Sequence, residues 1–308
     1  MKKLLLTLYI VTFSFANVKH IETLQQEFQK NVIELNIYQK RYGSYIKNNC
    51  DIDITCTKEV ISLLKSWDTV KNDKSLKFLL NRKKDKIKYD EQYWSKINYK
   101  LKEKKVTPEK SEFVSVVDLE KQLYIVTFWD NQSKKFHFIG QDFISSGNIQ
   151  REAEIVWGDD HYLKTPSGIF KSTKQGWRSD GKVSEDNVTL GYGEKDSYVF
   201  YFGKQETIRY NTFDRNGTKI YEKDKWKLIT DKLDFALHSH KSSAPMGEPN
   251  SHGCIRMTEE LNKFVDNNLI LHKNLFEDKK WLHRYSKAPR QPKNYNFAGE
   301  YLIVFDKI

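Results

Sequence analysis

One stretch in the last third of the chain holds the residues best suited to chemistry. Residues 237–257 read LHSHKSSAPMGEPNSHGCIRM and combine three histidines with one cysteine. The Gly, Pro, Ser and Asn content of this stretch is typical of a loop rather than of a packed core. A cysteine near an imidazole can act as a nucleophile, because the imidazole takes the thiol proton and stabilises the thiolate.

The spacing of these residues suggests how they would share one site. His252 lies two residues before Cys254, so both side chains share a face of an extended segment, whereas His238 reaches the cysteine only if the intervening loop folds back. Gly253 leaves room for a substrate carbonyl and lets backbone amides face a developing oxyanion. Arg256 has the guanidinium fork that suits a substrate carboxylate.

Two other interpretations of the same stretch stay open on these residues. The three imidazoles and the thiol are groups that zinc accepts as ligands, although no nearby carboxylate or second cysteine completes a familiar metal-binding spacing. A structural role is the other interpretation. We favour a nucleophilic cysteine over both, and expect no bound metal or cofactor.

The N-terminus and the other cysteines predict export. Residues 1–16 begin with a lysine pair, continue as an apolar run and end in small residues, as a cleaved signal peptide does. The apolar run is shorter than the roughly 20 residues that span a bilayer. In an oxidising compartment Cys50 and Cys56 are expected to form a disulfide, which leaves Cys254 as the unpaired thiol.

The chain is basic, with a formal net charge of +11. The lysines are mixed with acidic residues and accompany no nucleic-acid-binding motif, so we expect no nucleic acid partner. A solvated basic surface is the simplest interpretation. The alternative is attraction to an anionic polymer or membrane face in the cell envelope.

Hydrophobic patterns divide the chain into regions. Residues 17–110 carry apolar side chains at helical spacing and predict a helical N-terminal region. Residues 111–275 are rich in β-branched and aromatic runs and predict one β-rich domain, with a helix over 258–269 that Thr258 caps. Residues 276–308 form a C-terminal extension that ends in a predicted strand. The predicted strands within the domain are a hairpin over 113–129 and the runs 135–140, 198–203 and 234–239.

Three motifs resemble the L,D-transpeptidase catalytic domain, the YkuD-type family of peptidoglycan enzymes. SHGCIRM at 251–257, with a histidine sixteen residues before its cysteine, resembles the family signature. VSVVDLEKQLYIV at 114–126 is similar to the family's opening hairpin, and KTPSGIF at 164–170 resembles its Thr-Pro-x-Gly segment. The resemblance implies an α+β chain in which the helical region precedes a mixed β-sandwich.

The resemblance also implies roles for individual residues. Cys254 would be the nucleophile and His238 its base, oriented by the backbone carbonyl of Ser239, where the family often has glycine. His240 would help to bind an anionic stem or, as is more frequent at a strand end, would face solvent. The oxyanion region and the remaining substrate contacts would come from Ser251, His252, Gly253 and Arg256.

The implied reaction is acyl transfer on peptidoglycan stem peptides in the periplasm or cell envelope. The cysteine attacks the carbonyl before the terminal D-alanine of a tetrapeptide stem and forms a thioester. An amine of another stem, or of an envelope protein, would then give a crosslink or an attachment that remodels the wall and cell shape. Water would make the enzyme an L,D-carboxypeptidase. The alternative from another class is a non-catalytic peptidoglycan-binding protein.

Residues outside the motif have more general expected roles. Trp177, Tyr192 and Tyr210 lie in the long segment 171–235 and are expected either to form a lid over the substrate or to pack in the core. Thr165 and Gly168 are expected to set turn geometry and packing.

Overall fold

We describe a computed structural model of the 308-residue chain over residues 19–28, 91–151, 162–183, 190–241, 246–276 and 297–308. The predicted signal peptide, the predicted pair Cys50 and Cys56, and most of the predicted helical N-terminal region lie outside these ranges. From the N-terminal region the structure describes a helix over 19–28 and helix α7 (Glu91–Glu103). No helix in the described ranges is long and apolar enough to cross a membrane.

The strands form one mixed sheet in the order β4-β9-β1-β2-β3-β8-β7-β6-β5. The β1–β9 and β7–β8 pairs are parallel, and the other pairs are antiparallel. The strands are β1 (Glu112–Asp118), β2 (Leu123–Asp130), β3 (Lys135–Ser145), β4 (Gly168–Lys171), β5 (Trp177–Arg178), β6 (Tyr198–Asn211), β7 (Lys227–Ser239), β8 (Ile255–Met257) and β9 (Tyr301–Phe305).

The predicted β-rich domain is confirmed, and its strands belong to a single curled sheet. Phe170 of β4 packs on Phe235 of β7 with ring centroids 5.0 Å apart, although these strands lie far apart in the strand order. The amide of Thr173, just after β4, donates to the Tyr201 carbonyl of β6 at 2.8 Å. The curl therefore encloses the main hydrophobic core between the two ends of the sheet.

The opening hairpin forms as its sequence predicts. Asp118 and Leu123 are cross-strand partners, and Asp118 Oδ1 accepts a hydrogen bond from the Lys121 amide at 3.0 Å. Every residue of β1 and β2 is buried because both faces of the hairpin are covered. The main core covers one face. On the other, α7 packs Tyr93, Ile97 and Leu101 into a second cluster with residues of β1, β2 and β3.

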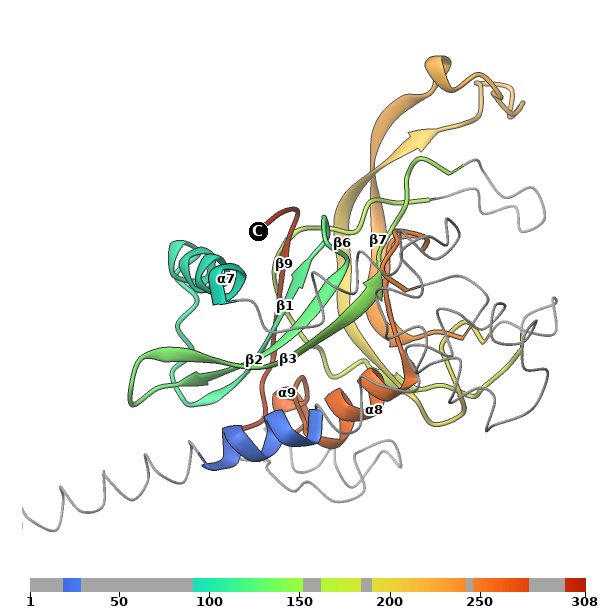
Figure 1. The fold of residues 1–308 in the computed structure, drawn as a ribbon. Coiled ribbons are helices and arrows are strands. Elements are labelled where there is room, and N and C mark those ends of the chain that lie inside the picture. Colours follow the sequence, from blue (N-terminus) through green and yellow to red (C-terminus); the bar gives the residue numbers. More distant parts are fainter. Residues whose placement is uncertain (1–18, 29–90, 152–161, 184–189, 242–245, 277–296) are drawn as a thin grey trace, which may run out of the picture.

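The remaining helices close one end of the curl (Figure 1). They are α8 (Glu259–Asn267), α9 (Lys273–Phe276) and the helix over 19–28, whose Phe28 packs edge-on against Phe264 of α8 at 5.0 Å. Thr258 caps α8 as predicted, because its hydroxyl accepts a hydrogen bond from the Leu261 amide at 3.2 Å.

The predicted final strand forms as β9, inside the sheet. It pairs with β1 on one side and with β4 on the other. The C-terminal end of the chain thus contributes an interior strand to the sheet of the β-rich domain, while the predicted boundary at residue 275 remains a prediction. Strands β6 and β7 form a long hairpin that projects beyond the rest of the sheet, with the short helix η1 (Lys223–Lys225) near its tip (Figure 1).

Candidate active site

Strand alternation places the two predicted catalytic side chains on one face. Leu233, Phe235 and Leu237 of β7 point into the main core, so Asp234, Ala236 and His238 lie on the opposite face. The same holds on β8, where Ile255 and Met257 belong to the core. Strands β7 and β8 run parallel, and His238 pairs with Arg256. Cys254 comes two residues before Arg256, so it lies beside Ala236 in the middle of this β7 face.

His238 is buried and held by the group that the family resemblance implied. Only 4% of the residue is exposed, and its Nδ1 lies 2.8 Å from the Ser239 carbonyl oxygen. A carbonyl only accepts, so Nδ1 carries the proton and Nε2 is left as the proton acceptor. Burial lowers the pKa of His238 to about 3, against the opposing effect of the Ser239 hydrogen bond. The imidazole is therefore neutral at physiological pH.

Cys254 rests as a neutral thiol beside this neutral base. Burial raises the pKa of the Cys254 thiol to about 11, although hydrogen bonding to the Ala236 backbone and the charge of Arg256 oppose the rise. Its Sγ donates to the Asp234 carbonyl oxygen at 3.4 Å, and among the described residues no hydrogen bond joins Sγ to His238. A thiolate–imidazolium ion pair is therefore not preformed between Cys254 and His238.

This resting state predicts the pH dependence of Cys254 alkylation. A thiol with a pKa near 11 stays protonated below that value, so each pH unit between 7 and 10 raises its thiolate fraction. The iodoacetamide rate should therefore rise about tenfold per pH unit, because the thiolate is the nucleophile. Mass spectrometry of the labelled Cys254 peptide measures the rate. A plateau between pH 5 and 8 would instead show a preformed thiolate–imidazolium pair.

The turn before Cys254 is fixed by hydrogen bonds and by close packing of Gly253. Gly253 has φ +132, and a Cβ there would lie 2.9 Å from the Leu233 side chain. The Thr165 hydroxyl donates to the Gly253 carbonyl at 2.6 Å and accepts from the Gly147 amide at 2.7 Å. Ser251 Oγ accepts from the Gly253 amide at 3.1 Å and donates to the Cys254 carbonyl. Thr165 thus directly supports the turn that precedes Cys254.

Replacing Thr165 by valine should destabilise this turn. The substitution keeps the side-chain shape but leaves the buried Gly253 carbonyl and Gly147 amide without their partner. Losing a buried hydrogen bond in this way costs about 1–3 kcal/mol. Urea unfolding of the valine variant measures the loss. Thr165→Ser, which keeps the hydroxyl, is the matched control, and equal stability of the valine variant and the wild type would contradict the assignment.

The predicted substrate-binding residues Arg256 and His252 form a cluster along one side of the cysteine. Arg256 donates to the Asn250 carbonyl at 2.8 Å, and its other terminal nitrogen lies 3.5 Å from His252 Nδ1. His252 stacks on Tyr162 with ring centroids 4.4 Å apart. These contacts engage His252 in the cluster, so His238 is the imidazole that the geometry favours as the base.

His240 is buried, so the expectation that it faces solvent is wrong. Its Nδ1 lies 3.1 Å from the Gly191 carbonyl oxygen. The neighbouring Ser239 hydroxyl donates to the Tyr192 carbonyl at 3.3 Å. Gly193 packs so closely that a Cβ there would lie 1.6 Å from Ser239 Oγ. The end of β7 thus anchors the loop 190–193 beside His238, which was not predictable from residue types.

The comparison with protein families agrees with this geometry. The model of the YkuD family, the L,D-transpeptidase catalytic domain, matches residues 112–273, more than half of the chain. The chain belongs to the YkuD family. No curated protein matches it. YkuD domains are L,D-transpeptidase catalytic domains of peptidoglycan metabolism, so the family assignment predicted from the motifs is confirmed.

The solved structures that resemble this chain have low sequence identity to it. The L,D-transpeptidase of Xylanimonas cellulosilytica DSM 15894 is 19% identical over 65% of this chain and 63% of its own, with a TM-score of 0.29. Bd1075 of Bdellovibrio bacteriovorus is 16% identical over 66% of this chain and 50% of its own, with a TM-score of 0.32. The helical cell shape determining protein Pgp2 of Campylobacter jejuni is 13% identical over 65% and 49%, with a TM-score of 0.26.

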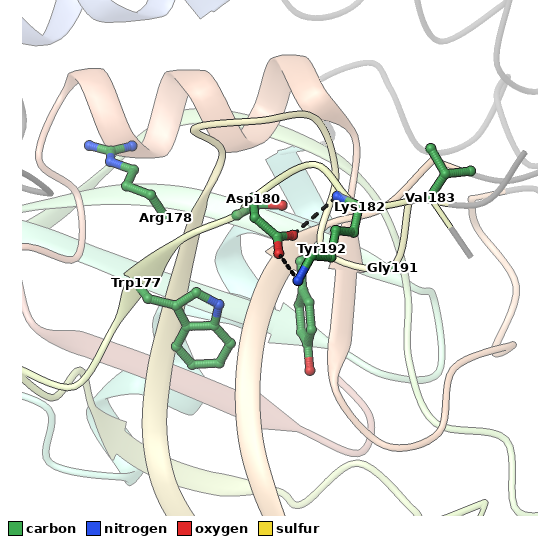
Figure 2. A pocket seen from close by; sticks show the side chains of 8 residues that line it. Trp177, Arg178, Asp180, Lys182, Val183, Gly191 and Tyr192 are labelled. Atoms are coloured by element: carbon green, nitrogen blue, oxygen red, sulfur yellow. Dashed lines mark hydrogen bonds and ion pairs between the residues drawn. The ribbon is translucent and has the colours of Figure 1, made fainter. Parts of the chain in front are cut away.

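In this YkuD domain, two of the three predicted lid aromatics line a pocket near His238. Trp177 and Tyr192 are neighbours (Figure 2), with ring centroids 5.5 Å apart. The Tyr192 ring also lies 5.0 Å from the His238 ring. Tyr192 is 48% exposed and so does not pack in the core. Tyr210 instead packs on Trp226 in the projecting hairpin, with ring centroids 5.8 Å apart.

This pocket has a volume of about 440 Å³ and a charged rim. Asp180 and Lys182, which both line it, form an exposed ion pair at 3.0 Å (Figure 2). Arg178 turns toward α8 and binds both carboxylate oxygens of Asp266, which anchors β5 to that helix. The lining residues are Trp177, Arg178, Ser179, Asp180, Lys182, Val183, Gly191 and Tyr192.

The histidines of the YkuD signature do not gather into a metal-binding group. In the described ranges, no set of three or more His, Cys, Asp or Glu side chains is arranged to hold a metal ion. His238, His240 and His252 instead contact separate partners: the Ser239 carbonyl, the Gly191 carbonyl and the Tyr162 ring.

Two residues next to the cysteine, Asp234 and Tyr201, were not predicted to belong to the site. Asp234 lies four positions before His238, and Tyr201 of β6 donates to its carboxylate at 2.7 Å. The period of two along a strand would have placed Asp234 on the His238 face once the strand was assigned. Nothing in the sequence indicated that Tyr201 would lie beside it, because β6 and β7 pair across a bulge.

Proposed function

We propose that this chain is an exported L,D-transpeptidase that acts on peptidoglycan tetrapeptide stems through a thioester on Cys254. The observation that carries the proposal is the arrangement of His238. Its Nδ1 is bound to the Ser239 carbonyl, so Nε2 is the proton acceptor on the face that also presents Cys254. Membership of the YkuD family supports the reaction class and the stem-peptide substrate.

In the first half-reaction the thiol attacks the carbonyl between the third stem residue and D-alanine. Sγ forms a bond to the carbonyl carbon while its proton passes to His238. The C–N bond then breaks, and the proton moves from His238 to the leaving amine, which departs as D-alanine. The turn at Gly253 and Cys254 is the proposed oxyanion region, because Gly253 has no side chain to block the substrate carbonyl and the Ser251 hydroxyl fixes the backbone of the turn.

In the second half-reaction an acceptor amine attacks the thioester. The C–S bond breaks, an amide forms, and the amine proton returns through His238 to the Cys254 sulfur. Attack by water instead releases a tripeptide stem and makes the protein an L,D-carboxypeptidase. We place the reaction in the periplasm or cell envelope, where the predicted signal peptide would direct the chain. Crosslinking of stems or attachment of an envelope protein would then remodel the wall and affect cell shape.

Incubation of the signal-free protein with purified tetrapeptide muropeptides tests the proposal. Mass analysis of the products should show dimers linked between third-position residues together with free D-alanine. Tripeptides alone would assign the carboxypeptidase activity. Unchanged tetrapeptides bound by the protein would reject catalysis and favour a peptidoglycan-binding role.

A further inference from the structure

An exposed carboxylate lies on the active-site face on the side of Cys254 away from His238. Asp234 and His238 flank Ala236 on β7, and two residues along a strand span about 6.6 Å. The Ala236 backbone hydrogen-bonds to the thiol, and Sγ also donates to the Asp234 carbonyl at 3.4 Å. The nucleophile therefore lies between its base and the Asp234 carboxylate.

The Asp234 carboxylate is held in place by Tyr201. The phenol donates to Asp234 Oδ1 at 2.7 Å, and this bond is the main reason that the pKa of Tyr201 is raised to about 12. A bulge positions the phenol: the register of β6 and β7 shifts between Tyr201 and Lys204, where Gly203 adopts φ +81. Tyr201 is thus level with Ala236, one step from Asp234 on the same face.

Among the described residues, the second carboxylate oxygen of Asp234 has no hydrogen-bond or ion-pair partner, because Tyr201 binds the other oxygen. Lys204 is the cross-strand partner of Asp234 but forms no ion pair with it. The negative charge of Asp234 acts on the Cys254 thiol, because it contributes to the raised pKa of that thiol. On another side of the cysteine, Arg256 and His252 form a basic cluster. The site therefore has one acidic and one basic side.

We propose that Asp234, oriented by Tyr201, binds the ammonium group of the acyl acceptor next to the thioester and so directs the acyl-enzyme toward aminolysis rather than hydrolysis. This inference rests on the proposed transpeptidase function and adds the residue that selects the acceptor. A carboxylate fixed by one hydrogen bond presents its other oxygen to a charged donor, and such charge-assisted bonds are among the strongest hydrogen bonds in proteins.

The proton balance of this step follows from the residues present. The bound acceptor gives one proton to water and becomes a free amine. Its nitrogen forms the amide bond as the C–S bond breaks, and its second proton passes through His238 to the Cys254 sulfur. One ammonium and one thioester thus give one amide, one thiol and one released proton.

The partition between dimer and tripeptide products measures the role of Asp234. Asp234→Asn keeps the backbone carbonyl that accepts the thiol but removes the charge. We expect the acyl-enzyme mass still to appear with this variant, and the ratio of dimer to tripeptide to fall about tenfold, as loss of one hydrogen bond to a charged group predicts. Glu206→Gln is the matched control, because it removes an exposed carboxylate from the same hairpin, farther from the cysteine.

Asp234→Glu serves as the second variant, since it keeps the charge and should retain most of the dimer. An Asp234→Asn variant that forms the acyl-enzyme with the wild-type product ratio would overturn the inference, and so would a wild-type protein that releases tripeptide alone. A wild-type protein that forms no acyl-enzyme would instead reject the proposed function itself. If Asp234→Asn does not fold, the product ratio of the wild-type protein is measured with added salt, because salt screens the attraction between an exposed carboxylate and an ammonium group. A fall in the ratio of dimer to tripeptide supports the inference, and a ratio that does not change with salt contradicts it.

Discussion

Replacing Cys254 with alanine should abolish turnover while leaving the fold intact. The reaction needs a nucleophile that forms a thioester, and no other cysteine among the described residues can replace it. In hydrolases that use a comparable nucleophile and base, removing the nucleophile lowers kcat by about 10⁶. Release of D-alanine from a tetrapeptide muropeptide measures the loss.

The structure indicates that the alanine variant will fold. The Cys254 side chain hydrogen-bonds only to backbone groups, those of Ala236 and Asp234, and is partly buried against the core. Thermal unfolding should therefore occur within a few degrees of the wild type. Cys254→Ser is the matched control, because it keeps a hydroxyl donor for the Asp234 carbonyl but offers a poorer nucleophile. Normal D-alanine release by Cys254→Ala would remove Cys254 from the mechanism.

Replacing His238 with alanine should lower the rate by about 10²–10⁴, the contribution typical of a positioned general base. The pKa of the buried imidazole is near 3, so the wild-type base stays unprotonated from pH 8 down to pH 5. Protonation of His238 should therefore cause no loss of activity across this range. Single-turnover measurement of D-alanine release at several pH values tests both statements.

His252→Gln separates the two candidate bases. His252 stacks on Tyr162 and lies beside Arg256, so its loss should disturb substrate binding more than proton transfer. We expect a higher KM with a smaller fall in kcat than for His238→Ala. A near-normal kcat for His238→Ala combined with an inactive His252→Gln would transfer the role of base to His252.

The sequence motifs predicted the local elements more completely than their arrangement. A run of β-branched and aromatic residues with a polar turn was sufficient to predict the β1–β2 hairpin, and Thr258 was sufficient to predict the start of α8. These features depend on residues close together in the chain. The position of β9 between β1 and β4 depends on pairing of residues far apart in the chain, such as Val114 with Tyr301 and Lys171 with Tyr301, for which the sequence carried no local signal.

In the candidate site, too, features set by residues close together in the chain were predicted, and features set by distant segments were not. The Cys254 and His238 pair followed from a seven-residue motif and one spacing, and the Ser239 carbonyl lies where the family resemblance implied. Thr165 was assigned only a turn role, because its bond to Gly253 joins segments 88 residues apart. Tyr201 was missed because a bulge with Gly203 in the left-handed region sets its position opposite Ala236. Sequence periodicity cannot locate such a shift in register.

Trapping the acyl-enzyme tests the central claim most directly. The protein is mixed with a tetrapeptide muropeptide, quenched in acid within one turnover, digested and mapped by mass spectrometry. The account predicts an adduct of the tripeptide stem on the peptide that carries Cys254, one equivalent of released D-alanine, and neither in Cys254→Ala. D-alanine release without an adduct on Cys254, or an adduct on another residue, would contradict it.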